Sequence, residues 1–449
     1  MSCLQFPSIS LPSRMQKLDR KLTLYGLTMV AIGACIGSGI FASPGHIVEL
    51  VNHQALVLVV WCVGGLIALT GALTFSELGS MFPKAGGVYV FLREAYGDMM
   101  GFLYGWVILL VINTGALAAL SITFADYMTF FIPLSQSGKV ILAICTIISL
   151  TIINMTGVNT SQWMANIFTG GKLLALAGLI ILGFIFYDPA NVELSLNFTD
   201  LPNDAFSVCL LALIGVLWAF GGWHHASYLA SETIRAERNV PRAMIYGVFI
   251  VMVVYVLANL SYMMLLPLDA IAASDKVAGD AMLAIVPWGG KVMALVIAIS
   301  VFGTIAIYTM SAPRIYFAMA EDGIFFQKLK YIHPKYKTPV YAMGIQAVWA
   351  IVLLLFWGTF KELITYVTIM DILFMTLAGV SLFIFRKNRP DQERPVKVIG
   401  YPIIPAFFVI ISALFVANAF IGKPLESSAG LLILALGVPA YYLFKRKKD

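Results

Sequence analysis

Long apolar runs separated by short polar segments fill almost the whole chain. Many of these runs exceed the roughly 18–20 residues that a helix needs to cross a ~30 Å hydrocarbon core. The pattern predicts an all-α polytopic membrane protein with twelve transmembrane helices, at residues 22–51, 55–82, 99–131, 139–156, 162–187, 206–233, 242–267, 291–318, 340–358, 362–386, 403–421 and 428–444. Composition supports this prediction, because 60% of the 449 residues are hydrophobic and only 12% are charged, whereas soluble domains carry roughly 25% charged residues.

Basic residues are distributed unevenly between the loops on the two sides of these spans. If the N-terminus lies inside the cell, 23 of the 29 Lys and Arg residues fall on the inner side and 5 on the outer side, while Lys172 lies within a span. Because short cytoplasmic loops are enriched in Lys and Arg, we expect a multi-pass protein of the plasma or inner membrane with both termini in the cytoplasm. This bias also explains the net charge of +6 without a nucleic-acid partner.

Glycines interrupt the first apolar run in its middle. Gly37 and Gly39 flank Ser38, and Pro44 follows; each glycine in a helix interior costs about 1 kcal/mol relative to alanine. Irregular backbone at this depth persists only where it is buried in protein or lines a water-filled cavity. Close helix packing is the alternative explanation, because Gly33 and Gly37 also have the GxxxG spacing.

A second break of the same kind lies in the sixth apolar run, where Gly221 and Gly222 follow Phe220. If helices 1–5 (residues 22–187) and helices 6–10 (residues 206–386) form two repeats, the odd number of crossings inverts the second repeat, and the two breaks meet at the membrane midplane. Paired breaks of this kind indicate the binding site of a transporter. The other segments are a cytoplasmic N-terminal segment, two peripheral helices and a basic cytoplasmic tail, at residues 1–21, 403–444 and 445–449.

The ends of two broken helices offer opposite partial charges. Free N–H groups and the positive dipole at a half-helix N-terminus suit an anion, and the freed carbonyl groups suit a cation. Because an α-amino acid carries both charges, we expect an amino acid substrate. A sodium ion or another organic solute would use the same backbone groups.

Five motifs occur in order within the first ten spans. They are Ile36-Gly37-Ser38-Gly39-Ile40-Phe41, Glu77-Leu78-Gly79 through Pro83-Lys84-Ala85-Gly86-Gly87-Val88-Tyr89, Phe220-Gly221-Gly222-Trp223, Glu237-Arg238-Asn239-Val240-Pro241-Arg242, and Pro313-Arg314 followed by Ala320-Glu321-Asp322-Gly323. With them the chain resembles the amino acid–polyamine–organocation superfamily, most closely the L-type amino acid transporters and the bacterial serine/threonine and alanine/serine/cysteine exchangers. The resemblance implies a LeuT-like five-plus-five inverted repeat with broken helices 1 and 6, peripheral helices 11 and 12, and alternating access by a rocking bundle.

The resemblance also implies which residues bind the substrate. All of them lie in or beside the two breaks: Ile36, Gly37, Ser38, Gly39, Trp218, Ala219, Gly221 and Gly222. The backbone of Gly37, Ser38 and Gly39 matches the family's carboxylate-binding segment, and the carbonyl groups near Ile36 and on the second break match those that bind the amine. Trp218 matches the aromatic residue that closes over the substrate, although L-type relatives usually have phenylalanine there and an ordinary packing role is the alternative.

Lys172 is a charged residue deep inside the fifth span. It lies about ten residues from the start of the span, which is roughly 15 Å at 1.5 Å per residue, and an ammonium group there costs at least a few kcal/mol unless it has a partner. Similar family members hold a lysine where sodium-coupled relatives bind a sodium ion. The resemblance therefore implies that Lys172 contacts broken helix 1 in place of the ion, and that the protein is a sodium-independent exchanger of small or large neutral L-amino acids.

Asp371 lies in the middle of the tenth span, where the relatives carry an uncharged polar residue. A carboxylate inside the membrane is a functional candidate by default and needs a partner. We expect Asp371 to face the bundle interior, close enough to helix 1 or Lys172 to pair with it or to carry a proton. A protonated aspartic acid that is hydrogen-bonded between helices is the alternative.

His224 and His225 replace a pair of small polar residues in L-type relatives. Adjacent residues on a helix point about 100° apart, so we expect only His224 to line the pocket for the substrate side chain. A histidine there accepts a polar or acidic side chain, or makes affinity depend on pH between about 5 and 8. A hydrogen-bonded packing histidine is an equally good explanation.

Charged residues also gather at the cytoplasmic ends of the spans. We expect Arg314 to extend its side chain toward the interface from the inner end of the eighth span. Two charge clusters are expected to form either inner-gate salt bridges or a solvated loop surface: Glu232 with Arg235, Glu237, Arg238 and Arg242, and Glu77 with Lys84, Arg93 and Glu94.

Other classes of protein lack their signatures in this chain. There is no His-Glu-x-x-His or Gly-x-Ser-x-Gly motif, P-loop or dinucleotide fingerprint, so we expect neither an enzyme nor an ATP-driven pump. A proton-coupled importer, a polyamine or basic-amine antiporter and a non-transporting nutrient sensor remain open alternatives. Because the five cysteines are scattered, we expect no metal site, no cofactor and no disulfide-linked ancillary subunit.

Overall fold

The computed structural model describes residues 18–190, 192–198, 201, 204–356, 360–422 and 424–446. Its α-helices are α1 (Leu24–Cys35), α2 (Gly39–Val51), α3 (Gln54–Met81), α4 (Val88–Tyr96), α5 (Asp98–Val107), α6 (Asn113–Met128), α7 (Gln136–Met155), α8 (Val158–Ile185), α9 (Ala205–Phe220), α10 (His225–Tyr228), α11 (Ala236–Leu265), α12 (Leu268–Ala272), α13 (Val277–Leu283), α14 (Gly289–Ser311), α15 (Pro313–Glu321), α16 (Val340–Phe356), α17 (Phe360–Asn388), α18 (Ile403–Gly422) and α19 (Pro424–Arg446). Shorter helical segments are the π-helix η1 (Ile108–Ile112) and the 3₁₀-helices η2 (Ala230–Glu232) and η3 (Gln327–Lys330). Within the described residues, β-pairing is limited to an isolated bridge between Leu22 and Thr233.

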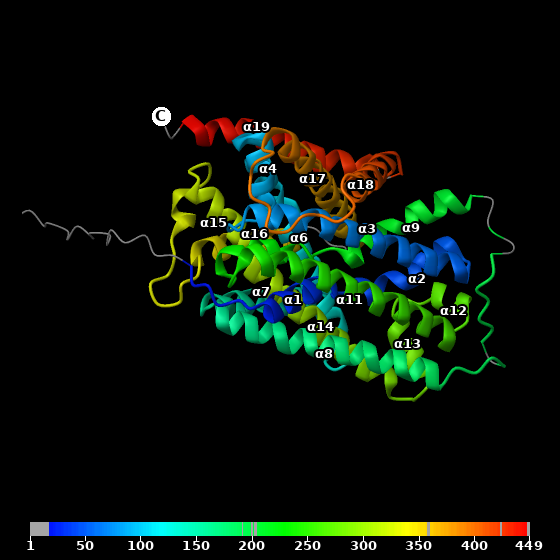
Figure 1. Cartoon of the computed structure of the whole chain (residues 1–449). Coiled ribbons are helices and arrows are strands. Elements are labelled where there is room, and N and C mark those ends of the chain that lie inside the picture. The colour runs from blue at the N-terminus through cyan, green and yellow to red at the C-terminus, as the bar shows by residue number, and fades with distance from the viewer. Residues whose placement is uncertain are drawn as a thin grey trace, which may run out of the picture.

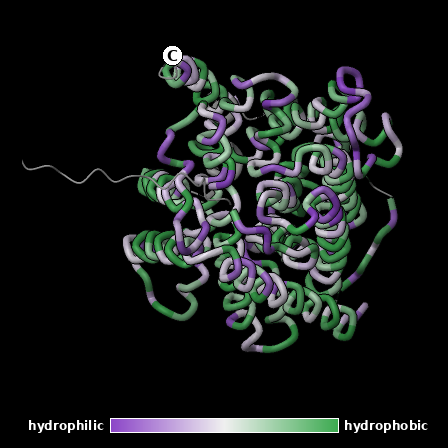
Figure 2. The backbone as a smooth tube through the Cα atoms, turned by 60° about the vertical axis from the view of Figure 1, so that its left-hand side comes forward, coloured by the Kyte–Doolittle hydropathy of each residue, from purple (hydrophilic) through white to green (hydrophobic). Residues whose placement is uncertain are grey.

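Ten helical stretches in the described part are long and apolar enough to cross a membrane: Leu24–Val51, Gln54–Met81, Asp98–Met128, Gln136–Met155, Val158–Ile185, Ala205–Tyr228, Ala236–Leu265, Gly289–Glu321, Val367–Asn388 and Ile403–Gly422. Two shorter apolar helical segments are Val340–Phe356 and Gly430–Lys445. Hydrophobic residues dominate these helices, as the green stretches of the tube in Figure 2 show. The prediction of an all-helical polytopic membrane protein is therefore confirmed.

The first and sixth apolar segments are both broken near their middle. Residues 36–38 separate α1 from α2, and residues 221–224 form the turn that separates α9 from α10. Because α2 packs along α9 and α1 contacts α10, the two breaks lie next to each other in space (Figure 1). The glycines at 37, 39, 221 and 222 thus interrupt the helices where the sequence predicts.

The first broken segment lies in the core of the molecule. The most apolar part of Leu24–Val51 is 89% buried, whereas that of Val158–Ile185 is only 28% buried. Helices α8, α11 and α14 surround α1, while α18 and α19 lie at one edge, toward the top of Figure 1, where they contact α3, α5 and α17. A charged or polar group that reaches α1 is therefore inside protein and not in contact with lipid.

Arg314 does not extend to the interface, which corrects the expectation from the sequence. Its side chain is fully buried, and its Nε and Nη2 atoms donate to the two carboxylate oxygens of Glu232 at 2.7 and 2.9 Å. A buried ion with two charge-assisted hydrogen bonds is better satisfied than one that must reach past the helix end. Glu232 therefore pairs with α15 and not with the basic residues that follow it in sequence.

Glu77 is likewise paired with residues that are far away in the sequence. Its buried carboxylate accepts hydrogen bonds from Arg386 at 2.7 and 2.6 Å and from the backbone N–H of Val398 at 2.8 Å, and Arg394 lies 3.1 Å away. These contacts join the end of α3 to α17 and to the loop that follows it. The predicted cluster of Glu77 with Lys84, Arg93 and Glu94 is therefore not formed.

Candidate substrate site

Lys172 contacts the end of α1 directly. Its ammonium group donates to Gly33 O at 2.9 Å, Ile36 O at 2.7 Å and Thr304 Oγ1 at 2.6 Å. A lysine ammonium has three protons, so these three acceptors satisfy it completely although its side chain is buried. The positive charge also lies at the C-terminus of α1, where the helix dipole favours a cation.

Two buried residues that the sequence did not single out hold the same region. The hydroxyl of Thr304 on α14 lies 3.0 Å from both Gly33 O and Ile36 O. The Tyr255 hydroxyl on α11 lies 2.9 Å from Cys35 O and 3.0 Å from Ala219 O, so one phenol contacts both broken helices. No sequence motif marks them, because their role depends on contacts across more than thirty residues of chain.

The two breaks are packed so closely that glycine is required on each side. A Cβ on Gly39 would lie 2.6 Å from the backbone of Ala219, and a Cβ on Gly222 would lie 2.8 Å from the carbonyl carbon of Ala34. Gly222 also has a φ of 103°, a conformation that L side chains rarely adopt. Gly39 and Gly222 therefore combine a helix break with close packing, whereas a Cβ on Gly37 would meet its nearest neighbour at 3.4 Å.

The N-terminus of α2 presents polar groups that the protein leaves without a partner. The Ser38 side chain is buried, and its Oγ has no hydrogen-bond partner among the described residues. The N–H of Gly37 donates to Cys35 O at 2.8 Å, so it is already used within the break. Free N–H groups at a helix N-terminus favour an anion, and a buried hydroxyl without a partner adds a further donor.

The carbonyl groups predicted to bind a substrate amine are mostly engaged in this conformation. Ile36 O accepts from Lys172, Trp218 O accepts from Gly221 N at 3.0 Å, and Ala219 O accepts from Tyr255. Each carbonyl oxygen has two lone pairs, so Trp218 O and Ala219 O can each accept one further donor. Ile36 O has Lys172, Thr304 and Ser300 within hydrogen-bond distance already.

Two adjoining cavities of about 30 Å³ each lie beside the second break. Such a volume holds one or two water molecules, so the surrounding side chains must move before an amino acid can enter. The cavities share the residues Leu217, Gly221, His224, Asp371 and Ile372, and one of them also includes Trp218, Gly222, His225, Tyr308 and Thr368. They place Trp218, the second glycine pair and Asp371 around one space.

Both histidines line this space, which corrects the expectation that only His224 does. Residues 221–224 form a turn and α10 begins only at His225, so the 100° spacing of helical neighbours does not apply to this pair. The His225 ring packs against Tyr308 in a tilted arrangement, with 4.2 Å between the centroids, and its Nδ1 lies 2.6 Å from Ser311 Oγ. His225 thus contributes to the wall of the cavity, as His224 does.

Asp371 lies beside His224 and not beside Lys172. Its Oδ1 lies 3.8 Å from His224 Nε2, which is too long for a hydrogen bond, and this oxygen is buried without a hydrogen-bond partner among the described residues. Lys172 cannot be its partner, because the three ammonium protons are taken by α1 and Thr304. The structure therefore separates the lysine and the aspartate into two parts of the site.

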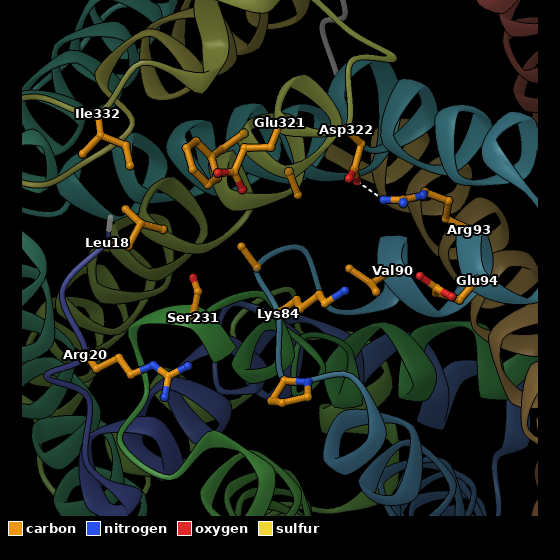
Figure 3. A pocket seen from close by; sticks show the side chains of 14 residues that line it. Leu18, Arg20, Lys84, Val90, Arg93, Glu94, Ser231, Glu321, Asp322 and Ile332 are labelled. Carbon is orange, nitrogen blue, oxygen red and sulfur yellow. Dashed lines mark ion pairs between the residues drawn. The ribbon is translucent and has the colours of Figure 1, made fainter. Parts of the chain in front are cut away.

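A larger cavity of about 410 Å³ opens on the side that the charge distribution assigns to the cytoplasm. Figure 3 shows Glu321 and Asp322 on one wall, opposite Lys84 and Val90, and the ion pair between Asp322 and Arg93. Tyr89 donates to Asp322 at 2.8 Å; burial, with the nearby carboxylate, raises the pKa of Tyr89 well above its usual range, so the phenol keeps this proton.

The loop at residues 83–87, which lines part of this larger cavity, also contacts the second broken helix. The N–H of Gly86 donates to Tyr228 O at 3.2 Å, and the backbone of Gly87 lies against Ser227. Tyr228 in turn lies 2.6 Å from the hydroxyl of Tyr104 on α5. A movement of α10 would therefore change the wall of the larger cavity and the walls of the two small cavities together.

Comparisons with known proteins agree with this architecture. A family model described as amino acid permease matches residues 22–441. The chain is 32% identical to the large neutral amino acids transporter small subunit 2 of Mus musculus, over 95% of this chain and 81% of the relative. It is 30% identical to the serine/threonine exchanger SteT of Bacillus subtilis (strain 168), over 95% and 96%, and 31% identical to the Asc-type amino acid transporter 1 of Homo sapiens, over 95% and 82%.

Proposed function

We propose, from the premise that this chain belongs to the amino acid permease family, that it is a sodium-independent exchanger of small or large neutral L-amino acids. The family and the similar proteins are transporters and exchangers, so the chain is a transporter and not an enzyme. The observation that carries sodium independence is the Lys172 ammonium, which is bonded to two carbonyls of α1 and to Thr304.

The chemistry of Lys172 supports its role as a substitute for sodium. Carbonyl and hydroxyl oxygens, the groups that it contacts, are also the ligands that a hard cation prefers. Two unit charges 4 Å apart repel each other by about 4 kcal/mol at an effective dielectric constant of 20. A sodium ion beside the ammonium would therefore bind weakly, while the fixed charge holds α1 in place without it.

The substrate backbone is proposed to bind across the two breaks. The carboxylate would bind at the α2 N-terminus, in the segment Gly37, Ser38 and Gly39. Because the Gly37 N–H bonds to Cys35 O, the donors would be the N–H groups of Ser38 and Gly39, with the unpartnered Ser38 hydroxyl beside them. The amine would donate to carbonyls near Ile36 and on Trp218, Ala219 and Gly221. The side chain would then point toward Gly222, His224 and Asp371, where the two small cavities lie.

The remaining assignments follow from the family. We propose the five-plus-five inverted repeat with twelve spans, both termini in the cytoplasm, and insertion into the plasma or inner membrane. The described cysteines, Cys35, Cys62, Cys145 and Cys209, are all free, and we propose that the protein works without a disulfide-linked subunit, although the name of one relative designates it a small subunit.

Exchange is expected to require amino acid on both sides of the membrane. Uptake of a labelled neutral L-amino acid into proteoliposomes should be at least about tenfold faster when the vesicles contain the same unlabelled amino acid than when they are empty. The purified protein should also gain thermal stability with that amino acid, because a ligand that binds only the folded state stabilises it. No stabilisation by any neutral L-amino acid, together with no uptake, would contradict the proposal; stabilisation without uptake would instead identify a sensor.

Proton-coupled import is the second candidate, and the partnerless oxygen of Asp371 beside His224 favours it. If Asp371 carries a coupled proton, an inward pH gradient should drive accumulation into empty vesicles. Asp371→Asn should abolish this effect and flatten the pH profile of uptake between about pH 5 and 8. Identical profiles for wild type and Asp371→Asn would remove the proton role and leave exchange alone.

A further inference from the structure

The acceptor groups around the two small cavities are not balanced by any basic side chain except histidine. Among the described residues, no lysine or arginine lies within ion-pair distance of Asp371, and the titratable side chain next to it is His224, with Nε2 3.8 Å from Oδ1. Tyr308 on α14 lines the same cavity as Asp371, and Tyr228 on α10 packs against His224 with 5.5 Å between the ring centroids. Asp371 Oδ1 is thus a buried acceptor that the protein itself does not satisfy.

His225 lies on the same wall, and its Nδ1 is 2.6 Å from Ser311 Oγ. Ser311 Oγ also lies 2.8 Å from Ile307 O, so its single proton has two acceptors within reach. A neutral imidazole has one donor and one acceptor nitrogen and brings no positive charge to the cavity.

The positive charge of Lys172 lies at the end of α1 and does not compensate Asp371. The Lys172 ammonium is saturated by Gly33 O, Ile36 O and Thr304 Oγ1, and the α1 C-terminus stabilises its charge locally. Asp371 has no comparable source of compensation, and burying a carboxylate without a partner is costly. A group that brought both a donor and a positive charge to the cavity would satisfy Asp371.

We infer that the pocket between the second break and α17 selects an L-amino acid with a short, protonated amine in its side chain, with Asp371 as its counter-ion. This inference rests on the proposed exchange of L-amino acids at this site, and it replaces the neutral side chain of that proposal with a protonated one. Gly221 of the second break and Asp371 line both cavities together, so a short chain is enough to reach from the break to the carboxylate. Trp218, Val367 and Ile372 supply apolar walls for its methylene groups.

The test uses pairs of amino acids that have the same shape and differ in one group. 2,4-Diaminobutyrate and norvaline differ by an ammonium in place of a methyl group, and serine and 2-aminobutyrate differ by a hydroxyl in place of a methyl group. Each compound is added to proteoliposomes of the full chain as an inhibitor of exchange. In wild type we expect 2,4-diaminobutyrate to inhibit at a concentration at least about tenfold lower than norvaline, because a site built to bond a polar group discriminates against the analogue that lacks it.

Asp371→Asn keeps the shape of the side chain and removes its charge. In this variant the ratio of the two inhibitory concentrations should fall to about one, whatever the absolute exchange rate. The matched control is Asp126→Asn, because Asp126 pairs with Lys139 in a half-exposed position away from the cavities, and this variant should keep the wild-type ratio.

Two outcomes would overturn the inference. One is a wild-type protein that binds norvaline as well as or better than 2,4-diaminobutyrate. If such a protein favours serine over 2-aminobutyrate, the pocket selects a neutral hydrogen-bond donor and not an ammonium. The other is an unchanged ratio in Asp371→Asn. If no L-amino acid is exchanged or inhibits, the proposed function itself fails, which is a different result from exchange without a preference for the ammonium.

Discussion

Exchange by Lys172→Met is expected to fall by at least about tenfold, close to the background of empty liposomes. Methionine has a similar length but no donor, so Gly33 O retains only the hydroxyl of Thr304, and Ile36 O retains Thr304 and the more distant Ser300 hydroxyl at 3.4 Å. Each buried polar group that loses its partner costs about 1–3 kcal/mol. The end of α1 should therefore loosen, and the break should no longer be held in the geometry that binds substrate.

The measurement is the initial rate of exchange in proteoliposomes that contain equal amounts of folded protein, checked by gel filtration and thermal unfolding. Lys139→Met is the matched control, because Lys139 pairs with Asp126 at 2.8 Å in a position that is partly exposed. Exposed ion pairs contribute about 0–1 kcal/mol, so this variant should exchange at close to the wild-type rate. Wild-type exchange by Lys172→Met would contradict the role given to the ammonium.

Gly222→Ala is expected to reduce exchange by at least about tenfold as well. The new methyl group would lie 2.8 Å from the carbonyl carbon of Ala34, and no side-chain rotation can relieve a contact with backbone. The φ of 103° adds strain for any residue with a Cβ. The two broken helices must therefore move apart, which displaces the groups that are proposed to bind the carboxylate and the amine.

Gly178→Ala provides the control for this substitution. Gly178 lies in the interior of α8, and a Cβ there would meet nothing within 4 Å. Alanine is favoured over glycine in a helix by about 1 kcal/mol, so this variant should exchange normally and unfold at an equal or higher temperature. Normal exchange by Gly222→Ala, measured beside this control, would show that the close approach of the breaks is dispensable.

The sequence predicted the features that depend on local patterning. Long apolar runs located the helices, because burial in a membrane requires a minimum length. The glycine pairs located the two breaks, and the depth of Lys172 in its span required a partner inside the protein. Its contact with α1 follows from the family resemblance, and the structure contains that contact.

The features that the sequence missed depend on contacts between distant segments. Arg314 is buried because Glu232 comes from a different part of the chain, and Thr304 and Tyr255 matter because α14 and α11 pack beside the breaks. The sequence singled out His224 alone because a helical period was applied to a turn, whereas both histidines line one cavity. Periodicity predicts which face a residue occupies only while the helix continues.

The central claim is that a fixed lysine ammonium replaces a sodium ion beside the first break. The most direct measurement is amino acid exchange in proteoliposomes with sodium chloride on both sides, compared with choline chloride at the same concentration and pH. The account predicts equal initial rates and equal apparent affinity in the two salts. Exchange that occurs only in sodium would contradict it.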